Sequence, residues 1–453
     1  MKIDQPAHSY AHASPGLPAA SGKARQRLFL AMLMIIYALN FVDRQILVIL
    51  QESIKQEYKL SDWQLGLLTG GAVSFLYTVM GVPIARWVDR GLNRVRLIAI
   101  ITALWSIMTA VCGLTHTYTQ ILVARMGVGL AEAGYTPAAH SLIADSYDKR
   151  HRPAAMGIFA LGVPLGTMLG LSLGGAVAHQ YGWRMALMVV GLPGVVVALI
   201  FWAIAREPVR GAADVAVTSD APAAGQLAPL PFWEAVKALF SIPAYVHILV
   251  ASTATSFATT GITSWLPSLL IRAHGMSMVD VGIGLGAIAG GAGFLGALLG
   301  GWQATRLSSR GLHATMWIPT AGLVLAIPLF ISAILFGTRS TTLWMLLVPM
   351  TLSTLWSAPS VALKQTLAPI RLRATASALS VVAANLLGVA LGPIVAGALS
   401  DLFGRTTGDP AMGLRWALVA MTGSLVVGII HWLLVIRALR RSEGKTPAQP
   451  SLA

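Results

Sequence analysis

Long apolar runs, each close to the length of a membrane-spanning helix, recur along the whole chain. A helix needs about 20 mostly apolar residues to cross the hydrocarbon core of a bilayer, and twelve segments meet this requirement. They are residues 28–50, 63–85, 97–114, 119–144, 154–179, 185–205, 244–271, 281–305, 314–336, 342–363, 374–400 and 416–436. Because the runs are continuous rather than alternating, a β-barrel is excluded. The pattern predicts an all-α membrane protein with twelve transmembrane helices.

Composition supports a membrane protein and argues against nucleic-acid binding. The 453-residue chain is 56% hydrophobic and 11% charged, whereas soluble domains carry about 25% charged residues. The formal net charge is +15. Most Lys and Arg residues lie in short loops between the apolar runs rather than on one soluble face. We therefore expect no nucleic-acid partner.

Basic residues are divided unequally between the two sets of loops. If the N-terminus is placed in the cytoplasm, the cytoplasmic segments contain 23 Lys and Arg residues and the opposite loops contain seven. The positive-inside rule then predicts that both termini are cytoplasmic. The prediction is a multi-pass protein of the plasma (inner) membrane.

The chain is internally repeated. A shift of 220 positions aligns Gly66 with Gly286 and Arg86 with Arg306, and the loop between the sixth and seventh runs is rich in Ala and Pro, as linkers are. Two six-helix pseudo-symmetric bundles are therefore predicted, related by an axis along the membrane normal. The predicted parts are a cytoplasmic tail (1–27), an N-terminal bundle (28–205), a linker (206–243), a C-terminal bundle (244–437) and a second tail (438–453).

Several motifs resemble one transporter superfamily. "GVPIARWVDRGLNR" after the second run and "RMGVGLAEAG" in the fourth resemble the signatures of the major facilitator superfamily. "NFVDR", "LSDWQLGLLTG", "GVGLAEAGYTPAAHSLIADSY" and "GIFALGVPLGTMLGLSLGG" together resemble its Spinster family. The resemblance implies proton-coupled transport of lysolipids or phosphorylated sphingoid lipids. The motif Asn-x-x-Asp-Arg is also shared with organic anion transporters, so both substrate classes stay open.

Four charged residues lie inside the predicted spans: Asp43 and Arg44 in the first, and Arg125 and Glu132 in the fourth. Charges within a span are costly and usually functional. We expect one neutral cluster that lines a cavity, with Arg125 pairing with Asp43. Because lost hydration disfavours the charged form of a carboxyl, Glu132, the deepest of the four, is the first candidate for carrying the transported proton.

The arginines are the candidates for binding an anion. Protonation of Glu132 or Asp43 would free Arg44 or Arg125 to bind a phosphate or carboxylate of the substrate through two parallel hydrogen bonds. In the alternative, the four charged residues form two static salt bridges that hold spans one and four together.

The second half has no charged residue in its predicted spans, so polar and aromatic residues are expected to line its side of the cavity. Such a surface suits an acyl chain better than a second anion. The remaining candidates for substrate binding are Asn40, Ser256, Thr260, Trp265, Trp356 and Asn385. Alternatively, the hydroxyl residues allow close helix packing and the tryptophans are packing residues.

Small residues recur every four positions in spans five and eleven, where they allow helices to approach closely. We expect both stripes to lie between the two halves. They are Gly162, Gly166, Gly170 and Gly174, and Gly388, Gly392, Ala396 and Ser400.

A cytoplasmic gate is predicted at the loops that follow spans two and four. Asp89 is expected to accept hydrogen bonds from a helix N-terminus of the other half or to pair with an arginine. The candidate gate residues are Gly81, Arg86, Asp89, Arg90, Asp145 and Arg152. For Arg94 and Arg96, a role as topology signals alone is expected.

Enzymatic and ATP-driven functions are not indicated. The chain has no phosphate-binding Gly-Lys-Ser/Thr loop and no His pattern typical of a metal site. The predicted function is proton-coupled, alternating-access transport of an anionic amphiphile by a monomer, with membrane lipids and protons as partners and no cofactor beyond the proton gradient. The alternatives are a proton-coupled symporter of small organic anions and a non-transporting membrane lipid sensor.

Overall fold

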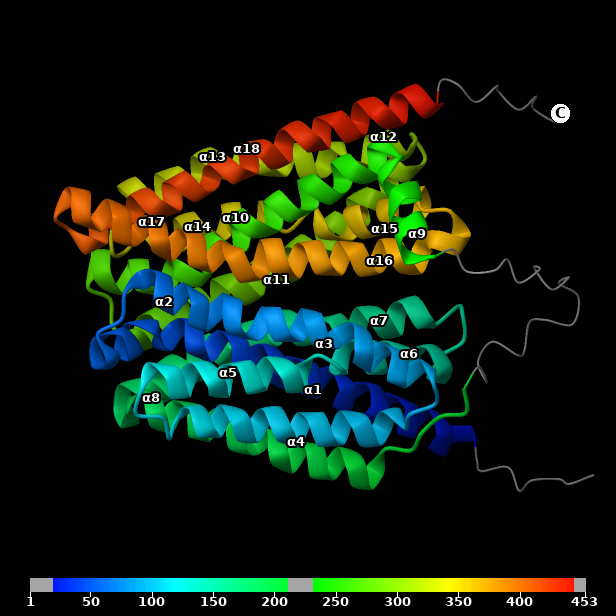
Figure 1. The fold of residues 1–453 in the computed structure, drawn as a ribbon, viewed down its shortest axis with the longest axis horizontal. Helices are drawn as coiled ribbons and strands as arrows, with labels where there is room; N and C mark the ends of the chain where they lie inside the picture. The colour runs from blue at the N-terminus through cyan, green and yellow to red at the C-terminus, as the bar shows by residue number, and fades with distance from the viewer. Residues whose placement is uncertain (1–18, 211–230, 444–453) are drawn as a thin grey trace, which may run out of the picture.

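The computed structural model describes residues 19–210 and 231–443, and the regular structure in these ranges is helical. The helices run along one common direction and form two groups, one from the first half of the chain and one from the second (Figure 1). Both described chain ends, Ala19 and Glu443, lie at the same end of the molecule. We call this the terminus end and the other the opposite end.

The first half is built from eight α-helices, α1 to α8, with a π-helical turn, η1, between the short α2 and α3. Their bounds are α1 Ala19–Tyr58, α2 Asp62–Gly66, η1 Leu67–Gly71, α3 Ala72–Asp89, α4 Arg94–Cys112, α5 Tyr118–Glu132, α6 Tyr135–Ser146, α7 Arg152–Ala160 and α8 Gly162–Ile204.

The second half follows with the same kind of helical elements. Their bounds are α9 Phe232–Phe240, α10 Pro243–His274, α11 Met278–Ser308, α12 Leu312–Thr315, α13 Trp317–Phe336, α14 Thr342–Leu352, α15 Ser357–Leu367, η3 Ile370–Leu372, α16 Arg373–Val382, η4 Ala383–Ala390, α17 Leu391–Thr407 and α18 Pro410–Glu443.

The helices account for the twelve predicted spans. Over the described ranges, nine helical stretches are long and apolar enough to cross a membrane, and a bent pair at 232–274 makes a tenth. One stretch, Arg152–Ile204, contains predicted spans five and six, which are separated at Gly182, where φ is 81°. Span four is divided into α5 and α6, which have 15 and 12 residues and are too short to qualify alone.

Helix breaks occur at equivalent places in the two halves. Span four breaks between α5 and α6, directly after Glu132, and span ten breaks between α14 and α15. A shift of 222 positions places Thr354, in the second break, on Glu132. Irregular backbone at membrane depth is tolerated where it lines a cavity or is buried in protein. The repeated fold thus interrupts one span of each half near the centre.

The glycine stripes pack within each half, so their predicted position between the halves is wrong. A Cβ on Gly166 of α8 would overlap the carbonyl group of Ala38 in α1, and one on Gly392 would overlap Phe257 of α10. Of the two stripes, Ser400 does reach across, because its Oγ donates to Asp62 Oδ2 at 2.6 Å. Small-residue spacing predicts a close helix contact but does not identify the partner helix.

Candidate functional site

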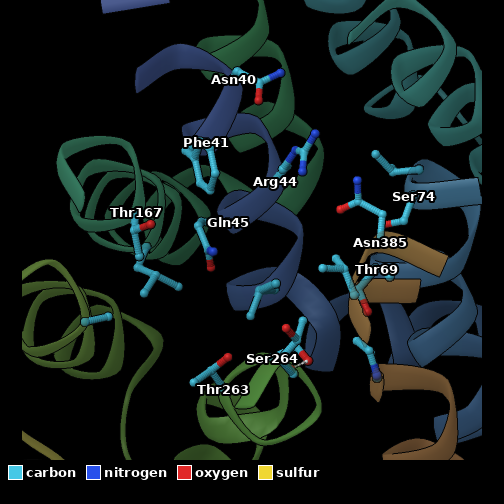
Figure 2. Close-up of a pocket in the computed structure, with 18 of the residues that line it drawn as sticks. Asn40, Phe41, Arg44, Gln45, Thr69, Ser74, Thr167, Thr263, Ser264 and Asn385 are labelled. Carbon is cyan, nitrogen blue, oxygen red and sulfur yellow. Dashed lines mark hydrogen bonds between the residues drawn. The ribbon is translucent and has the colours of Figure 1, made fainter. Parts of the chain in front are cut away.

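A cavity of about 450 Å³ lies between the two halves. Side chains from α1, η1, α3, α6 and α8 line one side, and side chains from α10, α11, α14, η4 and α17 line the other. Figure 2 shows Arg44 of α1 on the side of this helix that faces Ser74 and Asn385, and Gln45 on the side toward Thr167. Of the predicted residues, Asn40, Arg44, Thr260 and Asn385 belong to this lining. We call it the polar cavity.

A second cavity of about 600 Å³ adjoins the first. The two share Thr167, Thr260, Thr263, Ala289 and Met350 in their linings. We call the second one the apolar cavity, because small and apolar residues of α7, α8 and α11 dominate its wall.

The apolar cavity contains two more of the predicted residues. Ser256 and Trp356 both line it, from α10 and from the break between α14 and α15. The described lining includes no charged residue, and Phe294 and Leu298 of α11 are 43% and 55% exposed. Together the two cavities offer a charged region continuous with an apolar one.

Arg44 and Glu132 form a direct ion pair at the wall of the polar cavity. Arg44 Nε and Nη2 donate to Glu132 Oε2 at 3.0 and 2.7 Å. The guanidinium lies 4.9 Å from the ring centre of Tyr77. The Arg44 side chain is 24% exposed and the Glu132 side chain is fully buried. Arg44 therefore faces the cavity, and the carboxylate lies behind it.

Asp43 and Arg125 are brought together more deeply in the first half. Arg125 Nη1 lies 3.8 Å from Asp43 Oδ1, and Thr109 Oγ1 of α4 donates to the same carboxylate oxygen at 2.5 Å. Neither residue belongs to the lining of the two cavities, so Arg125 lies behind the cavity wall in this structure. Successive helical residues point about 100° apart. Arg44 faces the cavity, and its neighbour Asp43 therefore points toward α4.

Several polar atoms of this cluster lack a hydrogen-bond partner among the described residues. They are Asp43 Oδ2, Glu132 Oε1, and Arg125 Nε and Nη2. Buried polar atoms are paired in the great majority of cases. The two carboxylates therefore each keep an oxygen that can take a proton without first breaking an existing hydrogen bond.

Trp265 does not belong to the lining of either cavity, in contrast to its predicted role. Its side chain is fully buried and its Nε1 donates to the carbonyl oxygen of Pro393 at 2.9 Å. The Arg272 guanidinium lies 5.7 Å from its ring centre. Trp265 packs α10 against α17, which is the packing alternative given above for the tryptophans.

An ion-pair network that the sequence interpretation missed joins the two halves at the opposite end. Arg272 of α10 donates to Glu52 of α1 at 2.8 Å and to both oxygens of Asp62 of α2 at 2.7 and 2.8 Å. Lys55 Nζ also lies 2.5 Å from Asp62. Charge counting includes Arg272 and Lys55 only among the seven basic residues of the opposite loops, although acidic residues at the ends of neighbouring spans indicate possible partners.

The same closure includes a helix N-terminus. The carboxylate of Asp401, in α17, accepts hydrogen bonds from the backbone N–H groups of Asp62 and Trp63 at the start of α2, both at 2.9 Å. A carboxylate is favoured at this position by the unpaired N–H groups and the helix dipole. Polar contacts between the halves are thus concentrated at the opposite end.

At the terminus end, Arg94 is more than a topology signal. It is fully buried, and its guanidinium donates to Asp145 Oδ2 at 2.5 Å, to Glu207 Oε1 at 2.6 Å and to Ser141 Oγ at 2.7 Å. The predicted gate residue Asp145 is therefore tied to α4 and to the segment after α8. Hydropathy and charge counting cannot distinguish a buried basic residue at a helix end from an exposed one.

The other predicted gate residues are placed as follows. Arg152 donates to the carbonyl oxygen of Ala144 at 2.7 Å, and Arg86 and Arg90 are exposed. A Cβ on Gly81 would lie 3.8 Å from the carbonyl oxygen of Ala133. The side chain of Asp89 lies outside the described residues.

The second half contains a buried basic residue, Lys364, which lies one residue beyond the predicted end of span ten at residue 363. Helix α15 continues to Leu367, and Lys364 is 8% exposed. Among the described residues, the polar neighbour of its Nζ is Ser252 Oγ, at 3.3 Å. The statement that the spans of this half carry no charge is therefore wrong by one residue.

Comparisons with known proteins agree with this architecture. The family model described as Major Facilitator Superfamily matches residues 33–388. A protein named MFS-type efflux pump from Mycolicibacterium smegmatis is 31% identical over 92% of this chain and 95% of its own length. Human protein spinster homolog 1 is 30% identical over 84% of this chain and 74% of its own length.

A solved structure is also similar. It is the crystal structure of a bacterial homologue of the human lysosomal transporter Spinster in an inward-facing and unoccupied conformation. It superimposes with a TM-score of 0.82 at 30% identity and covers 92% of this chain and 98% of the other.

Proposed function

Because the chain belongs to the major facilitator superfamily and is a Spinster homologue, we propose that it is a proton-coupled transporter of an anionic amphiphile. Membership makes it a multi-pass membrane transporter rather than an enzyme. The substrate class proposed is a lysophospholipid or a phosphorylated sphingoid-like lipid. The observation that carries the proposal is the Arg44–Glu132 pair at the wall of a polar cavity that continues into an apolar one.

The shape of the cavity matches the two parts of such a lipid. A phosphate headgroup would bind Arg44 in the polar cavity, and an acyl chain would lie in the apolar cavity between α7, α10 and α11. Apolar surface removed from water stabilises the complex by about 25 cal/mol per Å². A charged headgroup without a chain would leave this apolar wall unused.

The ionised Glu132 carboxylate and the anionic substrate would compete for one guanidinium, that of Arg44. With Glu132 ionised, Arg44 is occupied by its carboxylate. A proton on Glu132 removes that charge, and Arg44 can then bind a phosphate through its planar fork of donors. The anion therefore binds best to the protonated form. Asp43 and Arg125 provide a second, deeper pair, in which Asp43 is the secondary candidate for a proton site.

Alternating access would open one end at a time. In this structure the network around Arg272 and Asp62 closes the opposite end. We propose that the terminus end faces the cytoplasm of a cell whose plasma (inner) membrane holds the protein, as the basic loops indicate.

A small organic anion is the second candidate, because the polar cavity alone, at about 450 Å³, accommodates a carboxylate next to Arg44. The apolar cavity favours the amphiphile.

The test is flux in proteoliposomes with an imposed pH gradient. Wild type, Glu132→Gln and the matched control Asp280→Asn, an exposed acid to amide change, would be compared with fluorescent lysophosphatidylglycerol and with a short dicarboxylate. We expect the gradient to accelerate lysolipid flux in the wild type and in the control but not in Glu132→Gln. If the gradient accelerates lysolipid flux in Glu132→Gln as much as in the wild type, the assignment of Glu132 as the proton carrier is refuted.

The two substrates separate the remaining functions. Flux of the dicarboxylate alone would favour the organic-anion symporter. Stabilisation by lysolipid without any flux would favour a lipid sensor and overturn the transport proposal.

A further inference from the structure

A second basic site lies on the outer surface of the C-terminal half, apart from the two cavities. Helices α13 and α18 border a pocket of about 380 Å³ at the terminus end, and Figure 1 shows α18 along the outer edge of this half. The described residues that line it are Trp317, Leu433, Ile436, Arg437, Arg440 and Arg441. None of them lines the polar or the apolar cavity.

Three arginines give this pocket a positive charge that none of the described side chains in its lining compensates. Arg437, Arg440 and Arg441 are spaced i, i+3 and i+4, which places them on one face of α18, and all three are exposed. The described lining contains no acidic residue, and the ion pairs found among the described residues include none of the three. This differs from Arg44, which Glu132 neutralises. An anionic group would supply the missing charge.

The wall next to these arginines is apolar. Trp317 at the start of α13 and Leu433 of α18 are 44% and 42% exposed. From Leu433 the same face of α18 continues through Ile430 and Val426, which are 50% and 47% exposed. Tryptophan is enriched at the headgroup level of a membrane. A basic group at the membrane edge thus adjoins an apolar stripe that leads into the hydrocarbon.

We propose that this pocket binds an anionic phospholipid of the surrounding membrane, with its phosphate on the three arginines and an acyl chain along α18. Arginine binds phosphate through parallel hydrogen bonds, and basic pockets between helices at the membrane edge are suited to anionic headgroups. A free phosphate would leave the apolar stripe unused. A zwitterionic lipid would bring its own positive charge near the guanidinium groups.

The test is binding of phosphatidylglycerol to the purified full-length protein in detergent, measured by native mass spectrometry and by the shift of the thermal unfolding midpoint. The test variant is R437Q/R440Q/R441Q. The matched control is R310Q/R371Q/R373Q, which removes the same charge from exposed positions at the same end. Phosphatidylcholine with the same chains and inorganic phosphate are the ligand controls.

We expect phosphatidylglycerol to bind and stabilise the wild type and the control variant, and phosphatidylcholine to do so far less. Since each basic side chain near an anionic lipid contributes about fivefold in affinity, the test variant should bind roughly 100-fold more weakly. A second variant, Trp317→Ala, should weaken binding without any change in charge.

Three results would overturn the proposal. They are equal binding of the two lipids, wild-type affinity in R437Q/R440Q/R441Q, and displacement of the lipid by low-millimolar inorganic phosphate. An equal loss in the control variant would likewise refute it, because binding would then follow net charge alone. None of these outcomes depends on transport through the central cavity.

Discussion

The two halves share one backbone plan but differ in chemistry. In the N-terminal half, Asp43, Arg44, Arg125 and Glu132 form two neutral pairs near the cavity. The C-terminal half contributes hydroxyls, an amide and a tryptophan to the cavities, and its buried Lys364 has a hydroxyl as its polar neighbour. Duplication of a fold therefore does not duplicate its site. We infer that one half provides the proton and anion chemistry and the other a surface for the apolar part of the substrate.

Removing one buried cation from each half should change stability in opposite directions. Arg125→Met leaves Asp43 buried without its charge partner, which costs about 3–5 kcal/mol. Lys364→Met removes an ammonium that has a neutral neighbour, which should stabilise the fold by about 1 kcal/mol or more. Thermal unfolding midpoints of the purified variants measure both effects. Destabilisation of similar size in both would contradict the stated difference between the halves.

Removing the guanidinium at the cavity wall should nearly abolish flux. Arg44→Gln eliminates charge-assisted hydrogen bonds to the anion, so lysolipid flux should fall roughly 100-fold. The double variant Arg44→Gln/Glu132→Gln removes both members of the ion pair and leaves no unpaired charge between them. If it also loses flux, the loss comes from the missing anion site and not from misfolding around an unpaired carboxylate. Arg339→Gln, an exposed arginine at the opposite end, is the control and should transport normally. Flux within a few fold of wild type in Arg44→Gln would remove Arg44 from the substrate site.

The glycine contacts within the halves also differ. A Cβ at Gly166 would overlap the backbone of Ala38, whereas at Gly388 it would meet the side chain of Ser256. Gly166→Ala should therefore destabilise the protein by about 2 kcal/mol, and Gly388→Ala by less, because a side chain relaxes more easily than a backbone. Unfolding midpoints provide the comparison. The reverse order would show that the α10–η4 contact is the more rigid one.

The smallest effect is expected for a hydroxyl in the C-terminal half. Thr260 lines both cavities, and Thr260→Val keeps its shape while removing one hydrogen-bonding group. The change should reduce flux by about threefold, in line with a hydrogen bond worth about 0.5–1.5 kcal/mol. A loss as large as that in Arg44→Gln would mean that both halves hold the polar headgroup.

The lengths of the apolar runs were sufficient to predict the helical membrane fold, because the length of a span is set by the bilayer. The pairing of Asp43 with Arg125, expected from the sequence, agrees with their 3.8 Å separation. Which charges face the cavity was not accessible, since neighbours such as Asp43 and Arg44 point in different directions on one helix. A shift of 222 positions places Thr354 on Glu132, but neither this pairing nor the helix breaks at the two positions were predicted.

Contacts between segments that are far apart in the sequence could not be predicted from the sequence. Arg272 and Asp62 are 210 positions apart and each lies next to a predicted span boundary, where charge counting assigns a topological role. For Trp265 the sequence leaves substrate binding and packing both open, and its hydrogen bond to Pro393 depends on how α10 meets α17. Residue type and spacing limit the interactions that a side chain can make, and tertiary packing decides which partners it contacts.

The most direct test of the Arg44–Glu132 exchange is the number of protons taken up when the substrate binds. Calorimetry of lysophosphatidylglycerol binding in buffers of different ionisation enthalpy measures this number. We predict uptake of about one proton per lipid near neutral pH, with affinity rising about tenfold for each pH unit of acidification, and no uptake in Glu132→Gln. Binding without proton uptake in the wild type, or equal uptake in Glu132→Gln, would contradict the exchange.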